Sequence, residues 1–197
     1  MKNSYTRGDG FLEGFLAKQR SNLANSFITP QKRKGKILDI GCGYYPYFLV
    51  NTNFNEKYGI DPFVNLSLIK KDKIKLIKNK VDNKKLVFQS NYFETITMLA
   101  VFEHIEGDKL IPVLREVYRV LKKDGMFIIT TPAPWADKLL HQMSKFGLIS
   151  SEEIHDHKHN HPRAKIGNIL QEAGFKKEKI KSGFFEIGFN MWFKAVK

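Results

Sequence analysis

The stretch that decides the fold is Lys36-Ile37-Leu38-Asp39-Ile40-Gly41-Cys42-Gly43. A short apolar run that stops at glycine is typical of a buried strand, and two closely spaced glycines let the backbone turn tightly beside a ligand. A second run, residues 57–61, ends in Asp61, 18 residues beyond Gly43. An acidic side chain there can accept hydrogen bonds from both hydroxyls of a ribose. The two segments together predict a nucleoside-binding crevice at the carboxyl ends of neighbouring strands.

Outward from this stretch, apolar strands alternate with amphipathic helices. Hydrophobic periodicity predicts strands at 36–41, 57–61, 75–77, 95–100 and 126–131, helices at 9–28, 111–121 and 163–173, and two closing strands at about 176–182 and 187–196 around Gly183. Buried strands separated by helices indicate a parallel sheet covered on both faces, whereas closely joined strands must be antiparallel. We therefore expect an α/β fold: a doubly wound, Rossmann-like seven-stranded sheet, mostly parallel with a C-terminal antiparallel hairpin.

The chain is expected to form one domain, residues 1–197, because 197 residues suit a single core. Residues 1–30 would form an N-terminal helix or cap. Residues 132–162 fit no core element and are long for a connection, so they are expected to be a lid or acceptor-site insertion.

Composition excludes several protein classes. The single cysteine, Cys42, can form neither an intramolecular disulfide nor a cysteine-based zinc site, and no apolar run reaches the length of a membrane span. The polar start lacks the apolar segment of a signal peptide, so a cytoplasmic location is expected. The net charge of +13 leaves a nucleic-acid partner open, but the densest basic run, residues 70–85, contains no stacking aromatic. A solvated basic face is the favoured interpretation.

The glycine loop also indicates which nucleoside would bind. A dinucleotide site needs a third glycine so that a helix N-terminus can hold the pyrophosphate. Here Tyr44, Tyr45 and Pro46 follow Gly43 instead. A nucleoside without phosphates fits this loop better.

Six segments in order resemble the motifs of one family. They are Ile37–Gly43, Tyr58–Asp61, Val81-Asp82-Asn83 with Phe93-Glu94, Leu99–Ile105, Leu114–Gly125 and Leu170–Phe175. The chain resembles the class I S-adenosylmethionine-dependent methyltransferases over about residues 36–197, and is similar to the small-molecule enzymes of ubiquinone and menaquinone biosynthesis. It departs from their pattern at Tyr45, which replaces the usual third glycine of the first motif, and at Glu94 and Asp124.

The resemblance implies the cofactor S-adenosylmethionine, the product S-adenosylhomocysteine, and a set of cofactor-binding residues. The backbone of Gly41, Cys42 and Gly43 would pass under the methionine and ribose. Asp39 would accept a hydrogen bond from the loop or from the cofactor's amino group, and Asp61 would bind the ribose hydroxyls. Asp82 with Asn83 would bind adenine, and Leu99 and Ala100 would lie beneath the methyl group. Cys42 itself is interpreted as a small packing residue.

Histidines are the candidates for a general base, since a neutral imidazole can take a proton near pH 7. His104 follows the fourth predicted strand, although it could equally serve only to start the next helix. His155, His157, His159 and His161 alternate near the end of the expected lid. The resemblance places this strip near the acceptor, and His104 and His157 are the predicted catalytic residues. A metal site there is the less favoured reading, and no metal is expected.

The predicted function is methyl transfer to a small-molecule or lipid-like acceptor. An RNA or protein methyltransferase that uses the basic surface is one alternative. A cofactor-binding subunit without activity is the other. The oligomeric state and the acceptor cannot be read from the sequence, because the segments that would choose the acceptor carry the fewest motifs.

Overall fold

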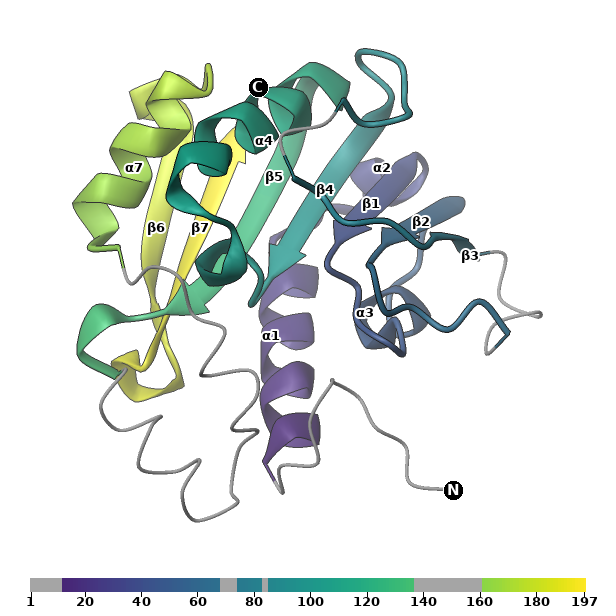
Figure 1. Cartoon of the computed structure of the whole chain (residues 1–197), viewed down its shortest axis with the longest axis horizontal. Helices are drawn as coiled ribbons and strands as arrows, with labels where there is room; N and C mark the ends of the chain where they lie inside the picture. Colours follow the sequence, from purple (N-terminus) through teal and green to yellow (C-terminus); the bar gives the residue numbers. More distant parts are fainter. Residues whose placement is uncertain (1–11, 68–73, 83–84, 137–160) are drawn as a thin grey trace.

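The seven predicted strands form one sheet in the computed structural model, which describes residues 12–67, 74–82, 85–136 and 161–197 (Figure 1). The strands are β1 (Lys36–Ile40), β2 (Glu56–Ile60), β3 (Ile74–Ile77), β4 (Phe93–Leu99), β5 (Leu121–Pro132), β6 (Ile180–Phe185) and β7 (Asn190–Val196). Their order is β3-β2-β1-β4-β5-β7-β6. The first five run parallel and β7 pairs antiparallel with both β5 and β6, as predicted.

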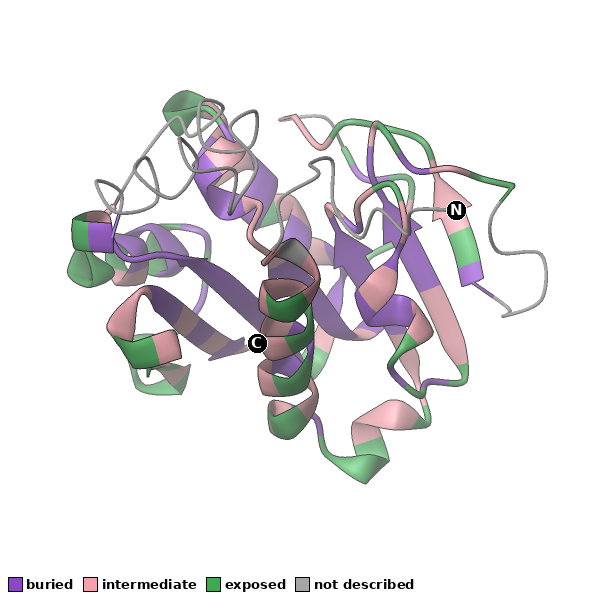
Figure 2. Ribbon diagram, turned by 90° about the horizontal axis from the view of Figure 1, so that it is seen from below, coloured by how far each residue is buried: buried purple, intermediate pink, exposed green. Residues whose placement is uncertain are grey.

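Helices cover both faces of this sheet, which confirms the doubly wound arrangement. They are α1 (Glu13–Phe27), α2 (Pro30–Arg33), α3 (Tyr47–Val50), α4 (Gly107–Val120) and α7 (Arg163–Glu172). Strand residues alternate between two cores: Leu38 and Ile96 join the α4–α7 side, whereas Ile37 and Ile128 join the α1–α3 side. Figure 2 shows this buried sheet between partly exposed helices. No described helix is both long enough and apolar enough to cross a membrane.

The closing hairpin differs from the prediction. The turn is not at Gly183 but at a 3₁₀ segment, Glu186–Gly188. Lys177–Lys179 forms another 3₁₀ segment, so β6 begins only at Ile180. Gly183 lies inside β6, where a Cβ atom would come within 2.8 Å of the Trp192 indole. Glycine serves there for close packing rather than for turning.

One further boundary differs. The helix predicted to start at 111 begins one turn earlier, at Gly107, and Pro112 lies inside it. After this helix, Asp124 is left-handed, with φ of 60°. A Cβ atom on Gly125 would instead lie 2.7 Å from the Lys122 carbonyl oxygen.

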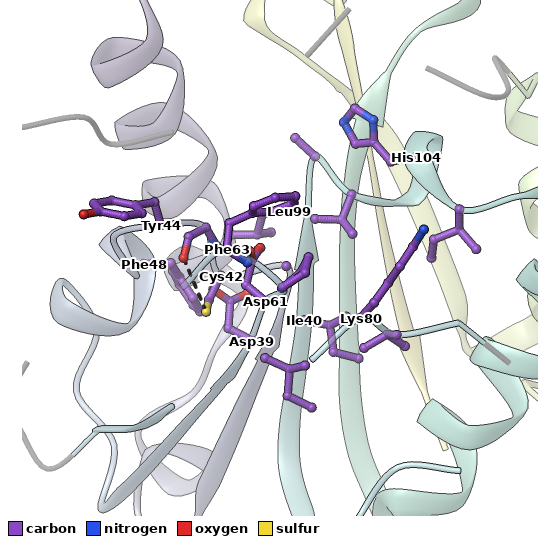
Figure 3. A pocket seen from close by; sticks show the side chains of 18 of the residues that line it. Asp39, Ile40, Cys42, Tyr44, Phe48, Asp61, Phe63, Lys80, Leu99 and His104 are labelled. Atoms are coloured by element: carbon purple, nitrogen blue, oxygen red, sulfur yellow. Dashed lines mark hydrogen bonds between the residues drawn. The ribbon is translucent and has the colours of Figure 1, made fainter. Parts of the chain in front are cut away.

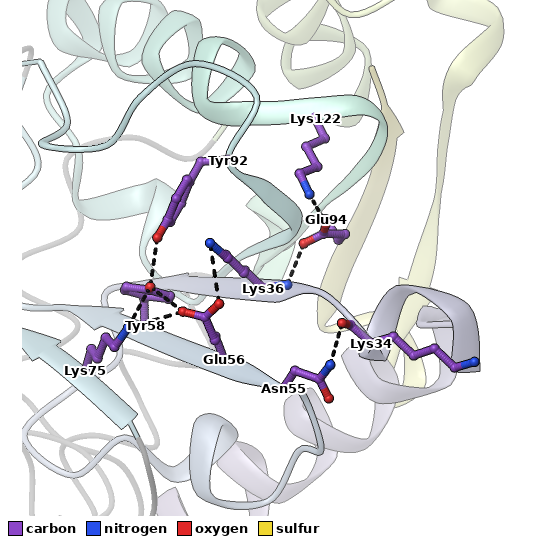
Figure 4. Close-up of polar contacts among 9 residues, drawn as sticks. All are labelled: Lys34, Lys36, Asn55, Glu56, Tyr58, Lys75, Tyr92, Glu94 and Lys122. Carbon is purple, nitrogen blue, oxygen red and sulfur yellow. Dashed lines mark hydrogen bonds and ion pairs between the residues drawn. The ribbon is translucent and has the colours of Figure 1, made fainter.

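A polar network ties the edge strands together (Figure 4). The Tyr58 hydroxyl donates to Glu56 at 2.8 Å, and Lys75 and Lys36 lie 3.2 and 3.4 Å from the same carboxylate. The Tyr58 hydrogen bond and the two lysines lower the pKa of Glu56 to about 2. Lys75, a described member of the basic run 70–85, is therefore ion-paired within the fold.

Candidate active site

A cavity of about 680 Å³ opens at the carboxyl ends of the parallel strands (Figure 3). Strands β2 and β3 are added on one side of β1, and β4 then lies on its other side. The order of the strands therefore reverses between β1 and β4. Ligands bind in such sheets at this reversal. Of the predicted site residues, the cavity is lined by Asp39, Gly41, Cys42, Gly43, Asp61, Asp82, Leu99, Ala100 and His104.

The loop after β1 is a turn that requires glycine. Gly41 and Gly43 have φ values of 74° and 79°, in the left-handed region that side chains disfavour. A Cβ atom on Gly41 would also lie 2.2 Å from the Val101 side chain. This close approach brings the backbone to the cavity wall.

Asp61 braces that loop while facing the cavity. One carboxylate oxygen accepts the Gly43 N–H at 3.0 Å and the other accepts the Phe63 N–H at 2.7 Å. Each oxygen keeps a second lone pair, so the carboxylate can also accept from two vicinal hydroxyls. The geometry fits the predicted ribose role.

Asp39 is fully enclosed at the base of the cavity. Burial raises the pKa of Asp39 to about 7; the nearby Asp61 charge raises this pKa too, and a hydrogen bond from Thr97 at 2.7 Å opposes the rise. A cation bound in the cavity would favour its charged form. The predicted contact with the cofactor's amino group is consistent with this environment.

Asp82 supplies an independent test of the adenine site. Its Oδ1 is buried and has no hydrogen-bond partner among the described residues, although it lines the cavity. Buried carboxylate oxygens are normally paired, so an unpaired one indicates a missing donor. The exocyclic amine of adenine is such a donor, and the residues present therefore fit S-adenosylmethionine. Asn83, the predicted neighbour, lies outside the described residues.

The end of β4 forms the opposite wall. Ala100 has φ of 54°, a left-handed conformation, and its N–H donates to the Thr130 carbonyl at 3.0 Å. His104 ends the 3₁₀ segment Phe102–His104 and lines the cavity across from Asp39 and Asp61 (Figure 3). This is the position in which a base beside the acceptor would lie.

The remaining site predictions concern Cys42, the histidines of the expected lid and a metal site. Cys42 is buried, and burial raises the pKa of its thiol, as expected for a packing residue. His157 and most of the expected lid lie outside the described residues, whereas His161 packs edge-on to Phe102. No group of three potential metal ligands is found within the described part of the chain.

Sequence reasoning expected the N-terminal helix as a cap but did not identify which residues of α1 line the cavity. Ala17 and Arg20, one helical turn apart, line the cavity together with Lys80, Lys109 and Phe63. The spacing of Ala17 and Arg20 places them on one helix face. Nothing in the sequence shows that this face meets the glycine loop rather than solvent.

Comparisons with known proteins identify the family of the chain. A profile of the family described as "Methyltransferase domain" matches residues 9–180. An uncharacterised protein of Methanocaldococcus jannaschii is 27% identical over 175 residues, which are 89% of this chain and 69% of that protein.

Solved structures show the same fold. A SAM-dependent methyltransferase from Archaeoglobus fulgidus has a TM-score of 0.66 at 18% identity, covering 94% of each chain. A Thermotoga maritima protein described as a SAM-dependent methyltransferase, possible histamine N-methyltransferase, has a TM-score of 0.68 at 17% identity over 95% of this chain and 92% of that one. With the family match spanning most of the sequence, the chain belongs to the methyltransferase domain family, of the class I S-adenosylmethionine-dependent type that its motifs resemble.

Proposed function

We propose that this methyltransferase transfers the methyl group of S-adenosylmethionine to a small-molecule or lipid-like acceptor. One observation carries the proposal: the cavity that contains Asp61 and Asp82 is also lined by His104 and by Ala17 of α1. Its volume of about 680 Å³ lies within the usual range for small-molecule pockets. The chain itself thus walls the space in which an acceptor would meet the cofactor.

When bound, S-adenosylmethionine supplies an electrophilic methyl group on a sulfonium. The protein's contribution is chiefly alignment and exclusion of water. Asp61 and Asp82 fix the nucleoside, and the glycine loop lets the backbone approach it. His104 would accept the proton from a hydroxyl acceptor, whereas an amine that binds neutral would need only positioning.

The basic surface gives weaker support to a macromolecular acceptor. Lys75 and Lys36 are both paired with Glu56, and Lys122 pairs with Glu94. These cations are therefore less available to phosphates than the net charge alone indicates.

Transfer of a labelled methyl group tests the proposal. Purified protein and labelled S-adenosylmethionine are incubated with lysate separated into small-molecule, lipid, RNA and protein fractions. Label is expected in the small-molecule or lipid fraction. Label in RNA or protein would overturn the acceptor assignment, and binding of S-adenosylhomocysteine with no transfer to any fraction would favour an inactive cofactor-binding subunit.

A further inference from the structure

Exposed apolar side chains gather at the edge of the sheet where the cavity opens. In the described part of the chain, this apolar rim comprises six large side chains that are at least 42% exposed: Phe15, Tyr44, Phe63, Leu66, Trp135 and Ile187. All but Phe15 follow the carboxyl end of β1, β2, β5 or β6, and β6 runs in the direction of β5 because both pair antiparallel with β7. The first turn of α1, which carries Phe15, and the β6–β7 turn project from the same lower edge in Figure 1.

Ile187 is held in solvent by an unusual turn. Its side chain is 95% exposed, and its φ of 56° and ψ of 28° are left-handed, a conformation that a β-branched residue rarely adopts. Glu186 and Gly188 on either side also have positive φ, 51° and 89°. The fold gains no burial from this side chain, so strain and exposure together indicate a role outside the fold.

Trp135 is presented beside this turn. It lies in the 3₁₀ segment Pro134–Ala136 after β5, and its ring is 56% exposed. The ring centroid lies 4.8 Å from that of Phe189, which is two residues after Ile187. The Ala133 N–H donates to the Phe189 carbonyl at 2.8 Å, so the end of β5 and the turn are fixed to each other. The fold therefore holds the indole and Ile187 in place together.

Positive charge is available at this edge. Lys18 is exposed one turn after Phe15 on α1, and Lys80 is exposed while lining the cavity. No ion pair joins either lysine to another residue in the described part of the chain. At the amino ends of the strands, by contrast, Glu56 and Glu94 are each paired with lysines. The unpaired lysines beside the cavity can attract anionic groups.

The combination of residues indicates what would cover the rim. Tryptophan is enriched at the headgroup level of membranes, and interfacial proteins insert apolar side chains there while lysines are attracted to anionic lipids. Interfaces between proteins are depleted in lysine instead. The net charge of +13 acts in the same direction, because it draws the whole chain toward an anionic surface. An anionic lipid surface therefore matches the rim better than a protein partner does.

We propose that the apolar rim docks this protein on an anionic lipid surface, with Trp135 and Ile187 inserted among the headgroups and the cavity mouth facing the lipid. The inference deepens the proposed function and rests on it, because a lipid-like acceptor would then pass from the bilayer into the cavity without crossing water. Tyr44 and Phe63 belong to both the rim and the cavity wall, so they would line this passage.

Co-sedimentation with lipid vesicles tests the proposal. Vesicles of phosphatidylcholine alone are compared with vesicles that contain about 30% phosphatidylglycerol, without S-adenosylmethionine, so that binding is measured independently of activity. The variants are Ile187→Asn, Trp135→Ser and Lys18→Gln.

Two substitutions away from the rim are the matched controls. Val87→Ser removes a 73% exposed apolar side chain next to Leu86, whose N–H donates to Glu116 near the end of α4 that leads into β5. Lys177→Gln removes an exposed charge shortly before β6 begins, at the opposite edge of the sheet.

We expect the wild type to bind the anionic vesicles at least about tenfold more tightly than phosphatidylcholine, with an affinity that falls as salt is added. Ile187→Asn and Trp135→Ser should each weaken binding to the anionic vesicles about 3- to 10-fold. Lys18→Gln should weaken it about 3- to 5-fold, and both controls should stay within about twofold of the wild type.

Stability and cofactor affinity separate this role from a structural one. Asparagine tolerates the left-handed region, so Ile187→Asn should unfold in urea no more easily than the wild type while it loses vesicle binding. Trp135 and Ile187 are not among the described residues that line the cavity, so both variants should bind S-adenosylhomocysteine as the wild type does.

The inference is overturned if the wild type does not bind anionic vesicles, binds both compositions equally, or keeps its affinity in the Trp135 and Ile187 variants. A wild-type dimer that these two variants dissociate, with no vesicle binding, would assign the rim to a second copy of the chain and overturn the lipid surface. Vesicle binding by a wild type that neither binds S-adenosylhomocysteine nor transfers methyl groups would support the docking face and refute the proposed function.

Discussion

Asp61→Asn is expected to weaken S-adenosylhomocysteine binding by roughly 2–4 kcal/mol, about 30- to 1000-fold. The wild-type carboxylate is only 4% exposed and already accepts two backbone N–H groups, from Gly43 and Phe63. Its remaining lone pairs would receive the ribose diol through two charge-assisted hydrogen bonds. Asparagine keeps one acceptor oxygen and turns an N–H donor toward a backbone N–H or a ribose hydroxyl. The ribose then loses one hydrogen-bond acceptor, and the remaining acceptor is no longer charged.

The assay is isothermal titration, with adenosine and 2′,3′-dideoxyadenosine added to locate the loss. The wild type should prefer adenosine by at least about tenfold, and Asp61→Asn should reduce this preference to within a few-fold. Because Asp61 also braces the glycine loop, the variant should unfold about 1–3 kcal/mol more easily, which a urea titration measures. Asp108→Asn, at an exposed acid in the first turn of α4, is the control for binding and should leave the preference for adenosine unchanged. Its loss of stability should stay below about 1 kcal/mol, the usual contribution of an acid at a helix N-terminus.

The reasoning is refuted if folded Asp61→Asn retains wild-type affinity for S-adenosylhomocysteine. It is also refuted if the variant still distinguishes adenosine from the dideoxy compound as the wild type does, since the diol would then be bound elsewhere.

Three further predictions concern residues that line the cavity. The pKa of Asp39 is raised to about 7, and a bound ammonium favours the charged form of this carboxyl. S-adenosylhomocysteine should therefore bind about tenfold more tightly at pH 8 than at pH 6. Isothermal titration of Asp39→Asn should show no such pH dependence. His104→Gln should lower labelled-methyl transfer to a hydroxyl acceptor about 100-fold with the S-adenosylhomocysteine Kd within a few-fold, and an unchanged rate would show that no base acts from this position. Ala100→Gly should relieve the left-handed backbone and raise the free energy of unfolding by up to about 1 kcal/mol in urea, whereas a clear loss of stability would mean that Ala100 is not strained.

The placement of three acidic residues at the cavity was predictable because its signals are local. Asp39 lies near the end of β1, whereas Asp61 and Asp82 follow β2 and β3. Parallel strands place their carboxyl ends at one edge of the sheet, however the helices pack. Ala17 and Arg20 had no such signal, since their place at the cavity depends on how α1 packs against the sheet. Gly183 was misread for a related reason: a glycine that admits a neighbouring tryptophan looks the same in sequence as one that makes a turn.

The strand order has a consequence for how the chain is made. β7 (Asn190–Val196) is synthesised after β6 but lies between β5 and β6 in the sheet. Until β7 leaves the ribosome, β6 has no strand to pair with and β5 presents an open edge, although β1 to β5 can already assemble the glycine loop. Chains interrupted between residues 185 and 190 would therefore carry two unpaired strand edges, a combination that favours intermolecular association. Released chains truncated after residue 185 should therefore aggregate more than chains truncated before β6.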